Sequence, residues 1–316
     1  MASIRVFGSE HQTHGHKKLE SIHENPHERG GHWKLRLFIG LTALIHLAGF
    51  IFVVAKNKTQ HVPLTKGYVM WPQGSNSTHT FSFGTEPATK IDMESLVGAF
   101  FLLSAIFQGV PAILFWPYYV RNLTVKCIQP FRWVEYSFSA SCLFVLGILI
   151  NGVFDFYHVL VVFFAMWTVM MLGLLQEERA YTSRLLIHGG HDQGRWVAWE
   201  FINFVLPHLI GWALYISLWY ESLDRFQLAM KHTSPDHPPK WVVSFYYFLF
   251  SVFSSFGINQ TVQMVRLFRR RKTSGSIAGI AIQHEYVYVI LSAVAKTISA
   301  YFLYTGLLAS SSAGHY

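Results

Sequence analysis

The chain has 316 residues, of which 52% are hydrophobic and only 13% are charged. Soluble domains carry about 25% charged residues, so this composition excludes an ordinary soluble protein and indicates a protein of the lipid bilayer. The formal net charge is +8, but the basic residues are spread between long apolar stretches rather than gathered in one patch, which argues against nucleic-acid binding.

The chain divides into a polar start, a long membrane domain and a short end. Residues 1–32 are polar and contain six histidines, and we predict a disordered cytoplasmic tail there. Residues 33–309 form the membrane domain, and residues 310–316 form a short external tail. Apolar runs of about 18 residues or more predict seven membrane-spanning helices in this domain. They are Leu35–Val54, Leu96–Val120, Phe131–Ile150, Phe156–Leu175, Trp196–Tyr220, Trp241–Val265 and Tyr286–Leu308.

The loops between these helices predict how the domain lies in the membrane. The first loop, residues 55–93, is polar and contains the strand-like pieces Tyr68–Trp71 and Thr80–Phe83, which predict a small β-hairpin. Lys and Arg residues number 17 on the side of the amino terminus and 7 on the opposite side. Since basic residues concentrate on the cytoplasmic side of a membrane, we predict a cytoplasmic amino terminus and an external carboxyl terminus. The predicted fold class is therefore an all-α, rhodopsin-like bundle of seven transmembrane helices.

One lysine, Lys296, is surrounded on both sides by apolar helix. A charge at the centre of a bilayer costs about 2.5–3.5 kcal/mol on insertion scales, so such residues usually face the interior of a bundle and carry function. Lys296 follows Glu285 by about 11 residues, or roughly 16 Å of helix, which places it near mid-membrane. An amine in an apolar pocket loses its proton readily, and the neutral amine can form an imine with an aldehyde.

Glu135, in the third predicted span, is the natural partner of this lysine. The two residues could form a structural ion pair and nothing more. Alternatively, a carboxylate within about 4–6 Å of an imine nitrogen would keep the imine protonated. Serines lie one helical turn from both charges, and they could hydrogen-bond the charged centre. These serines are Ser292 and Ser299 around Lys296, and Ser139 after Glu135.

Two motifs make the sequence resemble the heliorhodopsins, a family of retinal proteins. Phe131-Arg132-Trp133-Val134-Glu135-Tyr136-Ser137 is similar to the counterion motif of the family, and Leu291-Ser292-Ala293-Val294-Ala295-Lys296 is similar to its retinal-attachment motif. Weaker similarity covers segments of every other predicted span except Trp196–Tyr220. The family's cytoplasmic amino terminus agrees with the charge count.

This resemblance implies roles for particular residues. Lys296 would bind all-trans retinal as a Schiff base, with Glu135 as its counterion. His46 would lie in a polar cavity beside it, where Gln108 replaces a second histidine of the family and cannot take up a proton near neutral pH. The other residues expected to bind the chromophore are Ser292, Ser104, Ser139, Tyr136, Phe253 and Phe256. No metal site is predicted.

The resemblance further implies a light sensor rather than an enzyme. Light would isomerise retinal, the Schiff base would lose its proton, and a long-lived state would signal to an unknown cytoplasmic partner. The family pairs into homodimers in membrane lipid. An alternative is a light-gated passive conductor of protons or cations, which needs titratable groups along a wet path. A transporter or receptor without chromophore is a third reading. The candidate path residues of a conductor are Glu200, His208, His46, Glu135 and Glu285.

Overall fold

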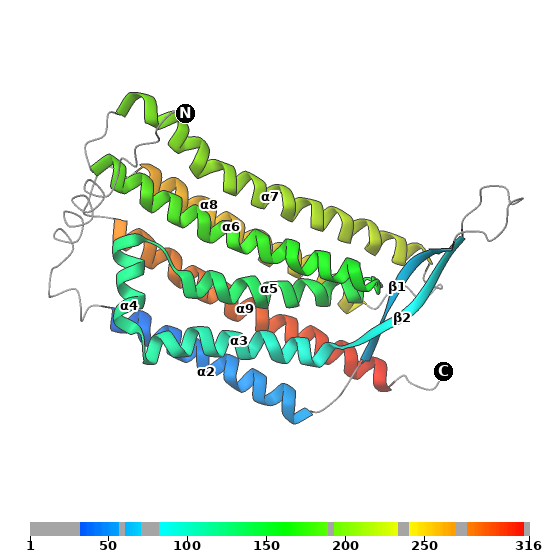
Figure 1. The fold of residues 1–316 in the computed structure, drawn as a ribbon. Coiled ribbons are helices and arrows are strands. Elements are labelled where there is room, and N and C mark those ends of the chain that lie inside the picture. Colours follow the sequence, from blue (N-terminus) through cyan, green and yellow to red (C-terminus); the bar gives the residue numbers. More distant parts are fainter. Residues whose placement is uncertain are drawn as a thin grey trace, which may run out of the picture.

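The computed structural model describes residues 32–56, 61–70, 82–188, 193–232, 240–269 and 277–312. Of the predicted tails at 1–32 and 310–316, residues 1–31 and 313–316 lie outside these residues. In the described parts, seven long helices lie alongside one another in a bundle (Figure 1). They are α2 (Trp33–Lys56), α3 (Met93–Ile113), α5 (Pro130–Ile150), α6 (Phe156–His188), α7 (Gln193–His232), α8 (Lys240–Arg269) and α9 (Ile277–Ser312).

Six of these helices are long and apolar enough to cross a membrane, counted over the described residues. They are α2, α3, α5, α6, α8 and α9. The predicted span Trp196–Tyr220 lies within α7, which is a helix of 40 residues but is not one of the six. The protein is therefore an integral membrane protein with at least six membrane-capable helices.

The prediction of the second span, Leu96–Val120, is wrong at its carboxyl-terminal end. Helix α3 ends at Ile113, and a separate short helix, α4 (Trp116–Arg121), begins after a break. Pro117 occupies the first turn of α4, where its missing N–H is harmless, whereas in a longer α3 it would have removed a backbone hydrogen bond and crowded the preceding turn. Helix α4 and the π-helical turn η2 (Asn122–Lys126) therefore cross one end of the bundle (Figure 1).

A two-stranded antiparallel sheet extends from the other end of the bundle (Figure 1). It consists of β1 (His61–Met70) and β2 (Ser82–Asp92), paired from His61↔Asp92 to Met70↔Ser82. The predicted hairpin is present, but its strands are longer than the predicted pieces. The full length of β2 was not predicted because the strand contains polar residues and Pro87. Pro is nevertheless tolerated in a sheet that consists of edge strands. The backbone N–H of Thr65 donates to the carbonyl of Phe154 at 2.9 Å, which fastens the sheet to the turn between α5 and α6.

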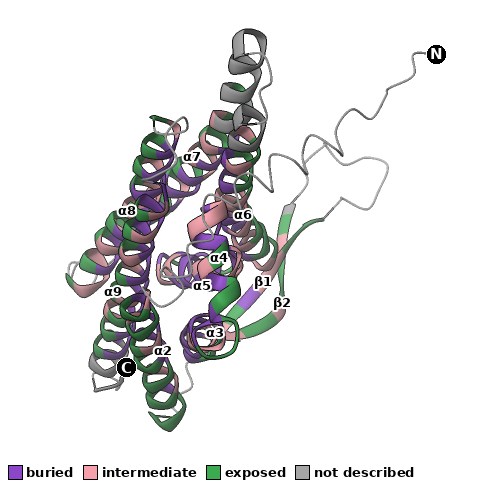
Figure 2. Ribbon diagram, turned by 90° about the vertical axis from the view of Figure 1, so that its left-hand side faces the viewer, coloured by how far each residue is buried: buried purple, intermediate pink, exposed green. Residues whose placement is uncertain are grey.

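Helix α5 lies at the centre of the bundle (Figure 2). Of its most apolar stretch 72% is buried, against 22–44% for the other five membrane-capable helices. The outer faces of those helices expose large apolar side chains such as Leu44, Val161 and Tyr301, as lipid-facing surfaces require. Polar side chains on α5 consequently face other helices rather than lipid.

Candidate functional site

The amine of Lys296 on α9 meets the carboxylate of Glu135 on α5 in the middle of the bundle. Lys296 Nζ donates to Glu135 Oε1 at 2.7 Å, and the two side chains are 5% and 2% exposed. A charge this deeply buried needs a partner and further hydrogen bonds to be stable. The structure thus brings together the two charged residues that the sequence singled out.

Three serines complete the hydrogen bonding of this pair. Ser104 Oγ and Ser139 Oγ each donate to Glu135 Oε1 at 2.7 Å, and Ser292 Oγ accepts from Lys296 Nζ at 2.7 Å. Hydrogen bonds to a carboxylate stabilise its charged form. Ser299 is also buried, but its hydroxyl has no hydrogen-bond partner in the described part of the chain.

The two expected cavity residues, His46 and Gln108, lie outside this hydrogen-bonded group. His46 on α2 is completely buried, and neither ring nitrogen has a hydrogen-bond partner among the described residues. Gln108 Oε1 accepts from Thr42 Oγ1 at 2.9 Å, which links α3 to α2. Gln108 is therefore engaged in joining helices rather than in binding Lys296.

Lys296 opens into an elongated apolar space formed by two adjoining cavities. The first has an empty volume of about 350 Å³ and is lined by Lys296, Ser292, Ser139, Tyr136, Phe253 and Phe256, among others. The second, of about 590 Å³, is lined by residues of α5, α6, α7 and α8. Met170, Phe253 and Phe256 line both cavities, so the two adjoin at these side chains. This space suits a long apolar ligand attached at Lys296.

The far wall of this space includes residues that the sequence did not indicate. Trp212 and Tyr215 on α7 form part of it. Gly257 on α8 lets Trp212 lie flat against that helix, because a Cβ there would stand 2.6 Å from Trp212 Cζ2. Aromatic residues and glycines are frequent in membrane helices, so no sequence signal distinguished these positions.

Four aromatic rings form a layer beside the Lys296–Glu135 pair. They belong to Trp133, Tyr136, Phe256 and Tyr288, with neighbouring ring centroids 5.1–6.5 Å apart. Lys296 Nζ lies 5.3 Å from the ring centroid of Tyr136, a cation–π distance. The Tyr136 hydroxyl donates to the backbone carbonyl of Tyr288 at 2.9 Å, which fixes the ring.

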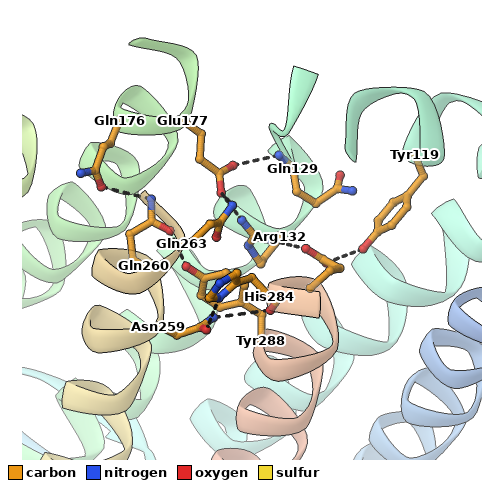
Figure 3. Close-up of polar contacts among 11 residues, drawn as sticks. Tyr119, Gln129, Arg132, Gln176, Glu177, Asn259, Gln260, Gln263, His284 and Tyr288 are labelled. Carbon is orange, nitrogen blue, oxygen red and sulfur yellow. Dashed lines mark hydrogen bonds and ion pairs between the residues drawn. The ribbon is translucent and has the colours of Figure 1, made fainter. Parts of the chain in front are cut away.

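A second buried polar group, the Arg132 cluster, lies against the Trp133 and Tyr288 rings of this aromatic layer, and Figure 3 shows it beside Tyr288. We define it as Arg132, Glu177, Glu285 and Tyr119. The guanidinium of Arg132 pairs with Glu177 on α6 and with Glu285 on α9. It also lies 3.9 Å from the ring centroid of Tyr288. Glu285, which the sequence offered as a candidate residue of a conducting path, is 1% exposed.

Helix α4 contacts the Arg132 cluster through the hydroxyl group of Tyr119. The Tyr119 hydroxyl donates to Glu285 Oε1 at 2.5 Å. Burial, reinforced by the nearby Glu285 carboxylate, raises the pKa of Tyr119 well above its ordinary value, so the hydroxyl keeps its proton at neutral pH. Tyr119 had been placed inside a predicted span, and its contact with Glu285 could not be foreseen.

Among the residues whose side chains the structure describes, hydrogen bonds do not join the titratable residues proposed for a conducting path into one chain. His208 Nε2 lies 2.9 Å from Thr261 Oγ1, and Nδ1 lies 3.2 Å from Gln176 Oε1, in the wall of the larger cavity. Among the described residues, no hydrogen bond joins the Glu135 group to the Arg132 cluster. Glu200 lies in α7, but its side chain lies outside what the structure describes.

Comparison with known proteins supplies the family. A family model described as Heliorhodopsin matches residues 35–308, which is most of the chain. No match is found among curated proteins. The matched range includes every residue of the Lys296–Glu135 group and of the Arg132 cluster.

Proposed function

Because the chain belongs to the heliorhodopsin family, we propose that it is a photoreceptor that binds all-trans retinal through Lys296. The observation that carries this proposal is the position of Lys296 Nζ, bonded to Glu135 and facing an elongated apolar space. The walls fit a polyene, since Phe253, Phe256 and Met170 line both halves of the space. When bound as a Schiff base, retinal supplies visible absorption and isomerisation by light.

The residues around Lys296 hold a proton at its nitrogen. The Glu135 carboxylate lies 2.7 Å from Nζ and stabilises the positive charge there. Ser104 and Ser139 hold the carboxylate in place, and the Tyr136 ring faces the same nitrogen. The nearest acceptor for this proton is the Glu135 carboxylate, and its transfer there would neutralise both groups and remove the ion pair between α5 and α9, which favours a rearrangement of these helices.

We propose that this rearrangement is a long-lived signalling state read by a cytoplasmic partner. In this reading the chain is not an enzyme. Helix α7 acts as the seventh membrane crossing, the amino terminus is cytoplasmic and the carboxyl terminus is external. The excess of Lys and Arg on the amino-terminal side supports this orientation. We further propose that the protein forms homodimers in the membrane.

A passive light-gated conductor of protons or cations is the second candidate. It is favoured by buried titratable groups in two parts of the bundle, near Lys296 and near Arg132. The aromatic layer between these groups argues against it. Voltage-clamp recording of illuminated cells decides, because absence of current at every potential excludes a conductor.

Colour is the direct test of the photoreceptor. Protein expressed with all-trans retinal should absorb visible light, and Lys296→Ala should be colourless because, among the described residues, no other lysine lines the two cavities. Lys240→Ala is the matched control, since Lys240 is exposed at the start of α8, and it should stay coloured. A colourless wild type would refute the proposal and favour a transporter or receptor without chromophore.

A further inference from the structure

The part of the ligand space that is farther from Lys296 carries polar side chains. Gln176, His208 and Gln260 line the larger cavity, and none of them lines the smaller cavity at Lys296. Most of the other residues around them in the larger cavity are apolar, including methionines and aromatic rings. A chromophore attached at Lys296 would therefore direct its far end, the ring of retinal, towards these three side chains.

Hydrogen bonds fix the orientation of the His208 ring. The indole N–H of Trp212 can only donate, and it lies 3.0 Å from His208 Nε2, so this nitrogen accepts. The hydrogen of the neutral ring is then on Nδ1, which lies 3.2 Å from Gln176 Oε1. His208 therefore donates to Gln176, and both of its ring nitrogens are engaged.

Gln260 donates to the same oxygen from another helix. Its Nε2 lies 3.1 Å from Gln176 Oε1, and its own Oε1 accepts from the hydroxyl of Tyr288. Two donors, one on α7 and one on α8, thus converge on a single oxygen of Gln176. This convergence determines which end of the Gln176 amide is the oxygen and which is the nitrogen.

The amide nitrogen of Gln176 remains as a hydrogen-bond donor at the cavity. Gln176 is 2% exposed, and its contacts with His208 and Gln260 both use Oε1. Figure 3 shows the nitrogen turned away from Gln260 and from the Arg132 cluster. Among the described residues this nitrogen has no acceptor. A buried donor without a partner is unfavourable, so an acceptor from outside the chain would complete the site.

We propose that Gln176 Nε2 binds an oxygen atom on the ring of the chromophore, so that the pocket prefers a retinal whose ring carries a ketone. This inference rests on the proposed attachment of retinal at Lys296. A ketone oxygen only accepts hydrogen bonds, which matches the one donor that Gln176 offers, and His208 and Gln260 hold that donor in place. With an unsubstituted ring, a water molecule takes the position of the oxygen.

Competition between two aldehydes tests the proposal. Apoprotein is mixed with equal amounts of all-trans retinal and all-trans 4-oxoretinal, and the bound chromophores are extracted and separated by chromatography. Wild-type protein should bind the ketone roughly 2- to 10-fold in preference, which is the effect of one neutral hydrogen bond. The amount of each bound aldehyde is measured directly, so the different colours of the two pigments do not affect the result.

Two variants of cavity residues show whether Gln176 is responsible. Gln176→Met fills a similar volume with apolar atoms, which keep the donors behind it covered, and the preference should disappear. Tyr215→Phe is the matched control. Tyr215 lines the same cavity, but its hydroxyl is already bonded to the Phe250 carbonyl and to Ser254, so this variant should keep the preference.

Infrared spectroscopy gives a second measurement, with isotope labelling of the ketone carbon to identify its band. The band of the bound ketone should lie at lower frequency in wild-type protein than in an apolar solvent, and Gln176→Met should move it back. The proposal is overturned by a wild type that does not prefer the ketone, or by a preference that persists in Gln176→Met. If Gln176→Met does not fold, an unshifted ketone band in wild-type protein overturns it equally.

These outcomes separate the inference from the photoreceptor assignment. Wild-type protein that forms a pigment with all-trans retinal but shows no preference for the ketone would overturn the role of Gln176 alone. Wild-type protein that forms a pigment with neither aldehyde would refute the attachment at Lys296, and the role of Gln176 with it.

Discussion

Arg132 and Glu135 lie three residues apart on α5, yet their side chains belong to different buried polar groups. Arg132 pairs with Glu177 and Glu285, whereas Glu135 bonds Lys296. The positive charge that neutralises Glu135 therefore comes from α9 and not from its neighbour on the same helix. Consequently, a change of charge at Lys296 alters the balance at Glu135 and leaves Arg132 with both of its partners.

Removing the charge of Glu135 should change the colour of the pigment. In Glu135→Gln the protonated nitrogen on Lys296 loses the carboxylate that lies 2.7 Å away. We expect either absorption shifted to the red or loss of the proton at neutral pH, because the charged ground state is no longer stabilised. Absorption spectra over a range of pH measure both effects. A spectrum equal to wild type would remove Glu135 from the counterion role.

Removing a serine should shift the colour in the opposite direction and by less. Ser104→Ala or Ser139→Ala deletes one of the donors to Glu135 Oε1, each of which contributes about 1.5–3 kcal/mol as a hydrogen bond to a charged group. With one donor fewer, the negative charge stays more fully on the Glu135 carboxylate. It then stabilises the ground state of the protonated chromophore more strongly, which shifts absorption to the blue. Ser251→Ala, an exposed serine of α8 bonded to the Tyr247 carbonyl, should have no effect. Red shifts in both site variants would contradict this reasoning.

Two glycines that line the same cavity should respond differently to a methyl group. In Gly257→Ala the new Cβ would stand 2.6 Å from Trp212 Cζ2, so the indole must move and narrow the cavity. In Gly211→Ala the nearest atom, Leu172 Cβ, is 3.9 Å away, an ordinary contact. Titration of the apoprotein with retinal should show weaker or slower pigment formation for Gly257→Ala alone. Equal behaviour of the two variants would mean that Trp212 does not bound the ligand space.

Loss of the arginine in the Arg132 cluster should destabilise the protein strongly. Arg132→Gln leaves Glu177 and Glu285 buried without their cation, and breaking a buried pair in this way costs about 3–5 kcal/mol. Arg266→Gln is the control, because Arg266 is exposed and bonds Gln283 and His284; exposed polar pairs contribute about 0–1 kcal/mol. Thermal unfolding in detergent compares the two. A similar Tm for both variants would show that the Arg132 cluster contributes little to stability.

The sequence was sufficient to find the Lys296–Glu135 pair and most of the helices. Charged residues inside long apolar helices are rare, so Lys296 and Glu135 stood out, and the structure brings them into contact. Phe253 and Phe256 were found through family resemblance, and both line the cavity. The membrane-capable helices were recognisable because an apolar run of sufficient length is a strong signal.

Other features depend on contacts that no local pattern encodes. Glu177 and Glu285 lie near the ends of apolar runs, where a charge is normally exposed, and only packing against Arg132 and α4 buries them. The turn at Leu114 and Phe115 was missed because the apolar character continues through it. The length of β2 was missed because backbone pairing with β1, rather than alternating hydrophobicity, defines it.

The two ion pairs between α5 and α9 also determine how far these helices can slide past each other. Along α5 the order is a cation and then an anion, Arg132 and Glu135, and along α9 it is an anion and then a cation, Glu285 and Lys296. Axial displacement that brought Glu135 to Glu285, or Arg132 to Lys296, would place like charges together in a medium of low dielectric constant. The alternating charges therefore favour a single axial alignment of α5 and α9, because the neighbouring alignments would bring like charges together.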